Sequence, residues 1–260
     1  MSKWVWKGRR IYHASRLTLV AGLLTFAAGT HAGSPGDIEA GMFSACRVSQ
    51  ILPDGWQPLT FSRIRRHTGY SLVKDGGTVV IRASSQQSAS GLVRAISIAP
   101  REHPVIEWRW KVDNVLQKGN AATREGDDYP ARIYITFAFD PDKAGYLEKL
   151  EYEAARLVRG QDVPYRAISY IWGSNSQAGT MIPNAYTDRV MMFVVESGAG
   201  KLQQCVTERR NVYEDYQQAF GEEPPLISGV AIMTDTDNTA ESAVAWYGDI
   251  VFRSKKHVIE

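Results

Sequence analysis

The stretch VAIMTDTDNTAESAVAWYGDIVF, residues 230–252, contains two runs with the pattern of β-strands and an acidic polar segment between them. β-Branched and aromatic residues in such runs predict two strands joined by a hairpin loop. The loop holds Asp235, Asp237 and Asn238. Aspartate and asparagine cap turns by bonding to their own backbone, and they also offer the oxygen ligands that Ca²⁺ prefers. Three interpretations of these residues remain open: they form only a turn, they belong to a ligand pocket, or they bind calcium.

Strand patterns recur along most of the chain. Two of them show clear alternation, because Ile106, Trp108 and Trp110 share one face and Ile133, Ile135, Phe137 and Phe139 share another. Arg132, Tyr134 and Thr136 lie on the face opposite the second set. Further predicted strands cover 78–83, 91–99, 166–172, 189–197 and 202–210, with the polar segment 84–90 predicted as a turn.

Two segments predict helices. Residues 145–160 and 211–221 have apolar side chains at helical spacing, and each ends at a glycine. Because the helices do not alternate regularly with strands, a parallel β-α-β arrangement is disfavoured. The sequence predicts a mainly all-β protein, an antiparallel β-sandwich of jelly-roll type with two inserted helices, in one domain over residues 43–253.

The ends of the chain are expected to lie outside this domain. Residues 1–32 have the parts of a secretory signal peptide: a basic head without acidic residues, the apolar run 17–29, and small residues that predict cleavage after Ala32. The run is shorter than the roughly 20 residues of a membrane-spanning helix. We therefore expect a periplasmic or secreted protein without a transmembrane anchor after cleavage, with an uncleaved anchor as the alternative. Residues 33–42 are expected to be flexible, and 254–260 form a tail.

Charge and motifs exclude several functions. The whole chain has 30 Lys and Arg against 28 Asp and Glu, and cleavage would remove five bases and no acid, leaving a net charge of −3. A nucleic-acid partner is therefore not expected, and the basic patch 63–67 is interpreted as a solvated strand or turn. The histidines lack metal-ligand spacing, and no nucleophile-elbow, phosphate-loop or dinucleotide motif is present.

The two cysteines allow one structural prediction. Cys46 and Cys205 are far apart in the sequence, and export would permit them to form a disulfide. Such a bridge would close a long loop and stabilise the fold by about 4 kcal/mol. Two separate buried thiols are the equally weighted alternative.

Acidic, aromatic and arginine side chains remain as candidates for a site. An arginine can bind a carboxylate or phosphate through two hydrogen bonds, and aromatic rings beside amides suit a sugar ring. The predicted ligand-binding residues are Asp128, Arg132, Tyr170, Trp172, Asn184, Tyr186, Arg210 and Asp235. The alternatives are that Asp128 lies in a solvated loop, that Tyr170 and Trp172 fill the core, and that Arg210 pairs with a nearby acid. The predicted metal ligands are Asp235, Asp237 and Asn238.

Several separated segments resemble a known family. They are EWRWKV, GDDYPARIYITF, YIW, ERRNVYEDYQQAFGEEPP and IMTDTDNTAESAVAWYGDIVF. Together they resemble the bacterial secreted domain-of-unknown-function family 3047, over roughly residues 43–253. The resemblance implies a bacterial exported single domain, and it implies no activity or site residue. The strand pattern is more distantly similar to jelly-roll carbohydrate-binding modules, which is a fold-level analogy.

Three functions fit these features. The first is an exported protein that binds a glycan or a similar polar ligand, with calcium as a possible cofactor. The second is a glycan-active enzyme, either a hydrolase that uses Asp128 and Asp235 or a lyase that uses Tyr134 or Tyr170 as base with Arg132 beside a uronate. The third is a structural or interaction protein of the cell envelope. The sequence identifies no catalytic residue.

Overall fold

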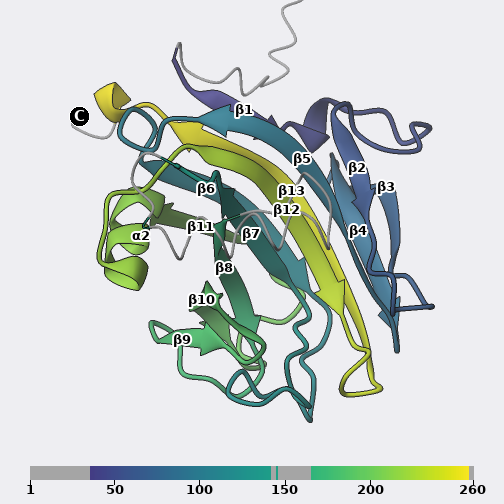
Figure 1. The fold of residues 1–260 in the computed structure, drawn as a ribbon. Helices are drawn as coiled ribbons and strands as arrows, with labels where there is room; N and C mark the ends of the chain where they lie inside the picture. The colour runs from purple at the N-terminus through teal and green to yellow at the C-terminus, as the bar shows by residue number, and fades with distance from the viewer. Residues whose placement is uncertain (1–35, 142–144, 146–164, 258–260) are drawn as a thin grey trace, which may run out of the picture. The chain divides into compact units, whose positions relative to one another are not determined.

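Two β-sheets form a sandwich in the computed structural model, which describes residues 36–141, 145 and 165–257 (Figure 1). The described residues belong to one compact unit, Gly33–Glu260. The predicted signal peptide, and the predicted helix 145–160 apart from Gly145, lie outside the described residues. Within the described part of the chain, no helix is long and apolar enough to span a membrane.

One sheet has six strands, all paired antiparallel. Its members are β1 (Ile38–Gly41), β3 (Gly69–Asp75), β4 (Thr78–Gln86), β6 (Val105–Val112), β11 (Val206–Asn211) and β13 (Ser242–Arg253). The order is β11-β6-β13-β4-β3, and β1 also pairs with β13. The long strand β13 therefore holds this sheet together, because β4 pairs with its first half and β1 with its second half.

The other sheet has seven strands in the order β2-β5-β12-β7-β8-β10-β9. They are β2 (Trp56–Leu59), β5 (Ala89–Ile98), β7 (Arg132–Phe137), β8 (Arg166–Gly173), β9 (Met181–Asn184), β10 (Thr187–Ser197) and β12 (Ile227–Asp235). Strands β8 and β10 pair in parallel, and the other pairs are antiparallel. The expected antiparallel sandwich is confirmed, with this one parallel pair as a local difference.

Both polar links that were predicted as turns between paired strands connect the two sheets instead. Strand β4 belongs to the six-stranded sheet and β5 to the seven-stranded sheet, and β12 and β13 are divided in the same way. The predicted hairpin after Asp235 is therefore wrong. Each link carries the chain from one layer to the other, and this brings segment 84–90 against the end of β12.

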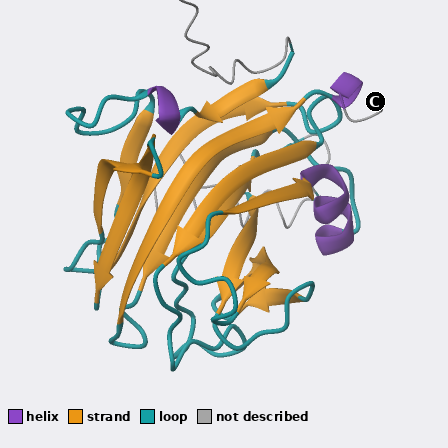
Figure 2. Cartoon of the chain, turned by 180° about the vertical axis from the view of Figure 1, so that it is seen from behind, coloured by secondary structure: helices purple, strands orange, loops and turns teal. Residues whose placement is uncertain are grey.

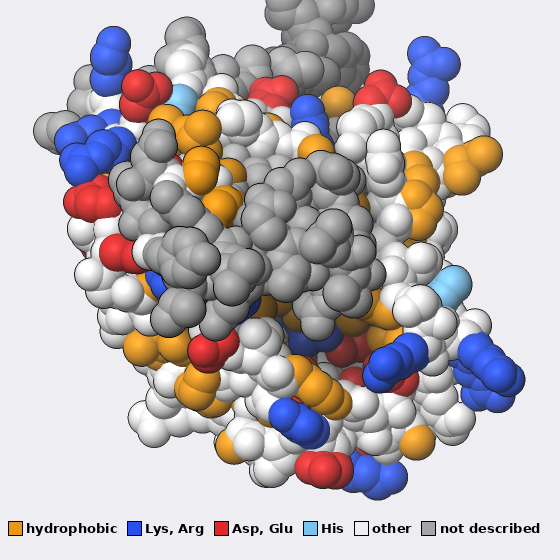
Figure 3. Space-filling model, in the orientation of Figure 1, with side chains coloured by type: hydrophobic (Ala, Val, Ile, Leu, Met, Phe, Trp, Pro, Cys, Tyr) orange, Lys and Arg blue, Asp and Glu red, His pale blue; other side chains and the backbone are white. Residues whose placement is uncertain are grey.

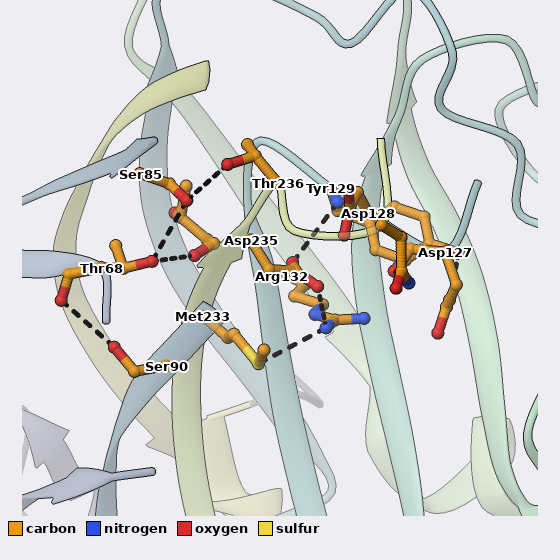
Figure 4. A network of polar contacts seen from close by, with 12 residues as sticks. Thr68, Ser85, Ser90, Asp127, Asp128, Tyr129, Arg132, Met233, Asp235 and Thr236 are labelled. Atoms are coloured by element: carbon orange, nitrogen blue, oxygen red, sulfur yellow. Dashed lines mark hydrogen bonds and ion pairs between the residues drawn. The ribbon is translucent and has the colours of Figure 1, made fainter. Parts of the chain in front are cut away.

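Buried hydroxyl groups fasten these two links to each other. The Thr68 hydroxyl donates to the carbonyl of Thr234 at 2.7 Å, and the hydroxyls of Ser85 and Thr236 lie 2.8 Å apart. Ser90 adds a hydrogen bond to the Thr68 carbonyl at 3.1 Å. These side chains are buried, and hydrogen bonding removes the penalty of burying them. Figure 4 shows that the network surrounds the end of β12, so it fixes the position of Asp235.

Alternation places the core where the sequence predicted it. Ile106, Trp108 and Trp110 of β6 are buried, as are Ile133, Ile135 and Phe137 of β7, whereas the predicted inward residue Phe139 follows β7 and is half-buried. The β6 residues pack against two side chains of the other sheet that the sequence assigns to ligand binding. Tyr170 stacks on Trp108 with ring centroids 5.1 Å apart, and Trp172 lies 5.9 Å from Trp110.

Tyr170 and Trp172 are therefore core residues, and their assignment to a ligand face needs correction. Both are 0% exposed and belong to the main hydrophobic core. The Tyr170 hydroxyl donates to Asp215 at 2.7 Å, and the Trp172 indole donates to the carbonyl of Gly198 at 3.1 Å. Register pairs Tyr170 with the core residue Ile133, so its ring points between the sheets.

The predicted helix at 211–221 is present as α2 (Val212–Phe220). Asn211 caps it by accepting the N–H of Glu214, and Gly221 ends it at a φ of 71°, which favours glycine. The helix lies at the side of the sandwich (Figure 2). Short 3₁₀ turns occur at Phe43–Ala45 and Lys255–His257.

Two expectations about the ends and the cysteines differ from the structure. Residues 33–42 were expected to be flexible, yet Ile38–Gly41 pairs with β13 as an added strand.

Cys46 and Cys205 are free thiols rather than a disulfide. The half-buried Cys46 thiol donates to the carbonyl of Met42 at 3.6 Å, whereas Cys205 is exposed before edge strand β11. One thiol is thus engaged in the fold while the other faces solvent.

Glu208 gives the fold a pH dependence that can be measured. Burial raises the pKa of Glu208 to about 7, and Glu196 adds to the rise while the Trp110 indole, which donates to Glu208 at 3.3 Å, opposes it. The folded protein thus keeps a proton that the unfolded chain releases, so stability should fall as the pH rises from about 4.5 to 7. Glu208→Gln should remove much of this fall. Thermal melts of both proteins at pH 5 and pH 8 measure it; an equal fall in both would contradict the prediction.

Candidate functional site

The site is built around an ion pair at the outer face of the seven-stranded sheet. Arg132 begins β7 and Asp235 ends β12, and the register of these neighbouring strands pairs Arg132 with Met233. Arg132 Nη2 contacts Asp235 Oδ2. The two residues are only 4% and 2% exposed, although they face away from the main core. In Figure 4 the arginine lies between the end of β12 and the Asp127–Tyr129 segment.

The Arg132 guanidinium is held in place but is not fully hydrogen-bonded. Its carbon lies 5.0 Å from the ring centroid of Tyr129 and 5.2 Å from that of Tyr134, so aromatic rings contact it twice. Nη2 also lies 3.4 Å from the sulfur of Met233. Nε and Nη1 are buried and have no hydrogen-bond acceptor among the described residues. Buried donors of this kind are rare in folded proteins and point to a missing partner.

Three carboxylates gather beside this arginine. One carboxylate oxygen from each of Asp128, Asp235 and Asp237 lies within 4.8 Å of the others. Thr239 holds Asp128 Oδ2 through its backbone N–H at 2.7 Å and its hydroxyl at 2.8 Å. Asp128 Oδ1 is buried and has no donor in the described part of the chain. The structure thus brings together Asp128, Arg132 and Asp235, three of the predicted residues.

Burial dominates the electrostatics of this cluster. It raises the pKa of Asp128 against the opposing hydrogen bonds from Thr239, and it raises the pKa of Asp235 against the attraction of Arg132. Burial alone would lower the pKa of Arg132, but Asp235 and other neighbours outweigh it and the net direction is upward. The arginine is therefore a fixed cation, and it lies beside three carboxyl groups, two of which burial disfavours in the ionised form.

A second group of predicted residues forms the rim. Asn184 donates to Asp127 Oδ2 at 3.2 Å and accepts the backbone N–H of Tyr186 at 3.0 Å. The Tyr186 hydroxyl donates to the carbonyl of Arg124 at 3.1 Å, and the Arg124 guanidinium lies 5.3 Å from its ring centroid. Tyr186 is 53% exposed, so its ring is accessible from solvent.

Arg210 does not belong to this group. It lies on β11 in the other sheet, where Nε donates to Asp215 Oδ2 at 3.0 Å. Asp215 also accepts the Tyr170 hydroxyl, so the three residues form an internal network. The alternative interpretation, pairing with a nearby acid, describes Arg210.

Asn238 and Glu241 also have specific partners. The Asn238 side chain donates to the carbonyl of Asp127 at 3.4 Å. The Glu241 carboxylate accepts the backbone N–H groups of Gln117 at 3.0 Å and Lys118 at 2.8 Å. Both side chains therefore hold the loop 235–242 against neighbouring segments. Neither belongs to the carboxylate cluster of Asp128, Asp235 and Asp237.

Sequence comparison identifies the family. Residues 54–251 match the family described as Protein of unknown function (DUF3047). The chain belongs to the DUF3047 family. This confirms the resemblance seen in the separated sequence segments. No curated protein sequence matches this DUF3047 protein.

Solved structures with some similarity have low identity to this DUF3047 protein. One is the glycoside hydrolase domain of Endo-D from Streptococcus pneumoniae R6, with a TM-score of 0.30, 8% identity, and coverage of 75% of this chain and 21% of that one. The carbohydrate recognition domain of Emp47p has a TM-score of 0.41 and 11% identity over 85% and 96% of the two chains. The cellulose-induced protein Cip1 has a TM-score of 0.30 and 11% identity over 75% and 90%. This chain spans about a fifth of the Endo-D chain.

Sequence reasoning missed residues that complete the site. Asp127, the neighbour of the predicted Asp128, accepts hydrogen bonds from the Tyr129 hydroxyl at 3.0 Å and from Asn184 at 3.2 Å. Both acids precede β7, so the alternation of strand faces does not separate them. Tyr129 and Thr239 were also missed. The contact between Thr239 and Asp128 spans 111 positions, and no local pattern signals it.

A depression of the surface lies elsewhere. Its volume is about 620 Å³, and its polar lining includes Arg66, Gln87, Asn114, Gln117 and Glu241. None of the clustered carboxylates lines it. We place the site at Arg132 because three of the buried polar atoms without partners among the described residues, Arg132 Nε, Arg132 Nη1 and Asp128 Oδ1, belong to this cluster and point to a ligand or water there.

The geometry does not favour the two enzymatic alternatives. In a hydrolase the two carboxyl groups must flank the scissile bond, whereas here Thr239 holds Asp128 Oδ2 and Arg132 pairs with Asp235. A lyase base would have to lose a proton near neutral pH. Burial instead raises the pKa of Tyr134 to about 12, and Tyr170 is enclosed in the core.

Proposed function

We propose that this DUF3047 protein is an exported binding protein that holds a glycan or a similar hydroxyl-rich ligand beside Arg132. The observation that carries the proposal is the arginine itself. Nε carries one N–H and Nη1 carries two, all without acceptors among the described residues. Each buried donor without an acceptor costs about 1–3 kcal/mol. Oxygen atoms of a ligand would supply the acceptors and recover that free energy on binding.

The arginine is prepared for such a ligand before it binds. Asp235 and the rings of Tyr129 and Tyr134 hold the guanidinium in one orientation. A side chain that is already ordered loses less conformational entropy on binding. One face of the protein is also hollowed, and basic and acidic side chains lie inside the hollow (Figure 3).

Charge favours a neutral ligand over an acidic one. When ionised and without a bound cation, Asp128, Asp235 and Asp237 outnumber the single arginine, so a carboxylate or phosphate would meet net repulsion. A sugar hydroxyl both donates and accepts, and it can therefore satisfy an arginine donor and a carboxylate acceptor in the same site. We accordingly favour a neutral saccharide and disfavour a uronate.

Tyr186 provides the accessible aromatic surface. Its ring is the one predicted aromatic ligand residue that is exposed, since Tyr170 and Trp172 are enclosed. Asn184, hydrogen-bonded to both Asp127 and the Tyr186 backbone, connects the ring to the polar centre. A sugar could stack its C–H face on Tyr186 while its hydroxyls reach the buried groups.

A glycan array followed by calorimetry tests the proposal. We expect the purified protein to bind at least one neutral polysaccharide from cell envelopes or plants. Tyr186→Ala should weaken that binding at least about tenfold, equivalent to roughly 1.4 kcal/mol, without lowering the melting temperature. Tyr213→Ala is the matched control, because Tyr213 has an arginine 5.6 Å from its ring centroid but lies on α2.

The results separate binding from other roles. Loss of affinity in Tyr186→Ala with normal affinity in Tyr213→Ala supports the site. Failure of the folded protein to bind any saccharide on the array would refute the proposal. Equal affinity in both variants would place the glycan somewhere other than this rim.

A further inference from the structure

We infer that Asp128, Asp235 and Asp237 bind a divalent cation, with Ca²⁺ as the ion that fits best. The inference goes beyond the proposed glycan and does not depend on it. It also changes the ligand set expected from sequence, because Asp128 takes the place that was assigned to Asn238. The Asn238 side chain instead donates to the Asp127 carbonyl.

The first support is geometric. One oxygen from each of the three carboxylates lies within 4.8 Å of the others. A cation at their centre would be close to all three after small side-chain movements, since Ca²⁺–oxygen distances are about 2.3–2.6 Å. Asp128 and Asp235 are buried, and Asp237 is half-buried, so a cation would enter past Asp237.

The second support is an oxygen that lacks a partner. Asp128 is 1% exposed, and Thr239 occupies its Oδ2 with two hydrogen bonds. Oδ1 of the same carboxylate is buried and accepts no hydrogen bond from a described residue. A buried carboxylate oxygen is expensive to leave unsatisfied, and a metal ion is one of the few partners that can satisfy it. This requirement is separate from the clustering of the acids.

The third support is the balance of charge. Ligands must be deprotonated to bind a metal, and in that form the three carboxylates carry three negative charges while Arg132, paired with Asp235, contributes one positive charge. The cluster then keeps a net negative charge, to which the nearby Asp127 adds, and a divalent cation would compensate it. Ca²⁺ suits the site better than Mg²⁺, because it accepts irregular oxygen ligands whereas Mg²⁺ requires near-octahedral geometry.

Calorimetric titration of the chelator-stripped protein with CaCl₂, and separately with MgCl₂, tests the inference. Terbium luminescence gives a second readout, because a tyrosine such as Tyr129 can sensitise a bound lanthanide. We expect one Ca²⁺ per chain, tighter than Mg²⁺. Asp128→Asn and Asp237→Asn should each weaken Ca²⁺ binding at least about tenfold, because losing even a residue that only supports a metal ligand typically lowers metal affinity by that much. Glu241→Gln is the matched control, since Glu241 lies in the same loop but outside the cluster.

Each outcome decides the matter. One Ca²⁺ per chain that is lost in both aspartate variants and retained in Glu241→Gln supports the site. No Ca²⁺ signal at millimolar concentration from the folded protein would overturn it, as would unchanged affinity in the aspartate variants or equal loss in Glu241→Gln. Tighter Mg²⁺ binding would overturn the choice of ion. No saccharide is present in the titration, so failure of the glycan proposal leaves the result intact.

Discussion

Arg132→Met should lower the free energy of unfolding by about 3–5 kcal/mol, the loss typical when one partner of a buried ion pair is removed. Arg132 is 4% exposed, and its removal would leave the carboxylate of Asp235 without its cation beside two further acids. Urea denaturation in the presence of a chelator measures the change without a contribution from metal ions. Asp235→Asn in the same chain should recover most of the loss, because the double variant has neither charge.

A surface ion pair provides the control. Arg101 and Glu223 lie 2.7 Å apart with side chains 70% and 41% exposed, so Arg101→Met should change stability by about 1 kcal/mol or less. If Arg132→Met cost no more than Arg101→Met, the buried pair would not stabilise the fold. A double variant as unstable as Arg132→Met would show that the loss comes from packing rather than from an unpaired charge.

Trp172→Ala should lower the free energy of unfolding by about 3–5 kcal/mol, because it would open a cavity between the sheets. Trp172 is 0% exposed, packs near Trp110, and donates its indole N–H to the Gly198 carbonyl. Trp172→Phe keeps much of the volume and should cost less, which provides a measurable variant if the alanine protein does not fold. Chemical denaturation followed by circular dichroism measures both.

Trp246 is the matched control for this prediction. It is half-buried on the outer face of β13, where Lys111 lies 4.4 Å from its ring centroid. Trp246→Ala should cost about 1 kcal/mol or less, because the ring already contacts solvent. Equal losses in the two alanine variants would contradict the assignment of Trp172 to the core.

Most strand positions and most inward faces were predictable from sequence. In β6 and β7 the side chains of one face are buried and most of those on the other face are half-buried. Residue types alternate along each strand in the same way, so the sequence reveals the inward face. Strand β8 is different, because all but its first residue are buried. Alternation cannot distinguish the two faces of such a strand, which is why Tyr170 and Trp172 were assigned to the ligand face.

The candidate site was predictable only in part. Asp128, Arg132 and Asp235 were selected because charged residues stand out where strands begin and end. Their association depends on the pairing of β7 with β12, which joins Arg132 and Asp235 across 103 positions. Tyr129 and Thr239 carry no signal of their own, because their importance arises from contacts with residues far away in the chain.

Strands β1, β2, β3 and β9 were not predicted, but the sequence by itself determined the β-sandwich class, the other strands, helix α2 with its Asn211 cap, and membership of the DUF3047 family. Local periodicity and local capping encode these features, so neighbouring residues suffice to read them. The tertiary structure alone decided that β4 to β5 and β12 to β13 cross between sheets, and that three aspartates meet beside one buried arginine. Strand order depends on which surfaces bury each other best, and that choice involves residues more than a hundred positions apart.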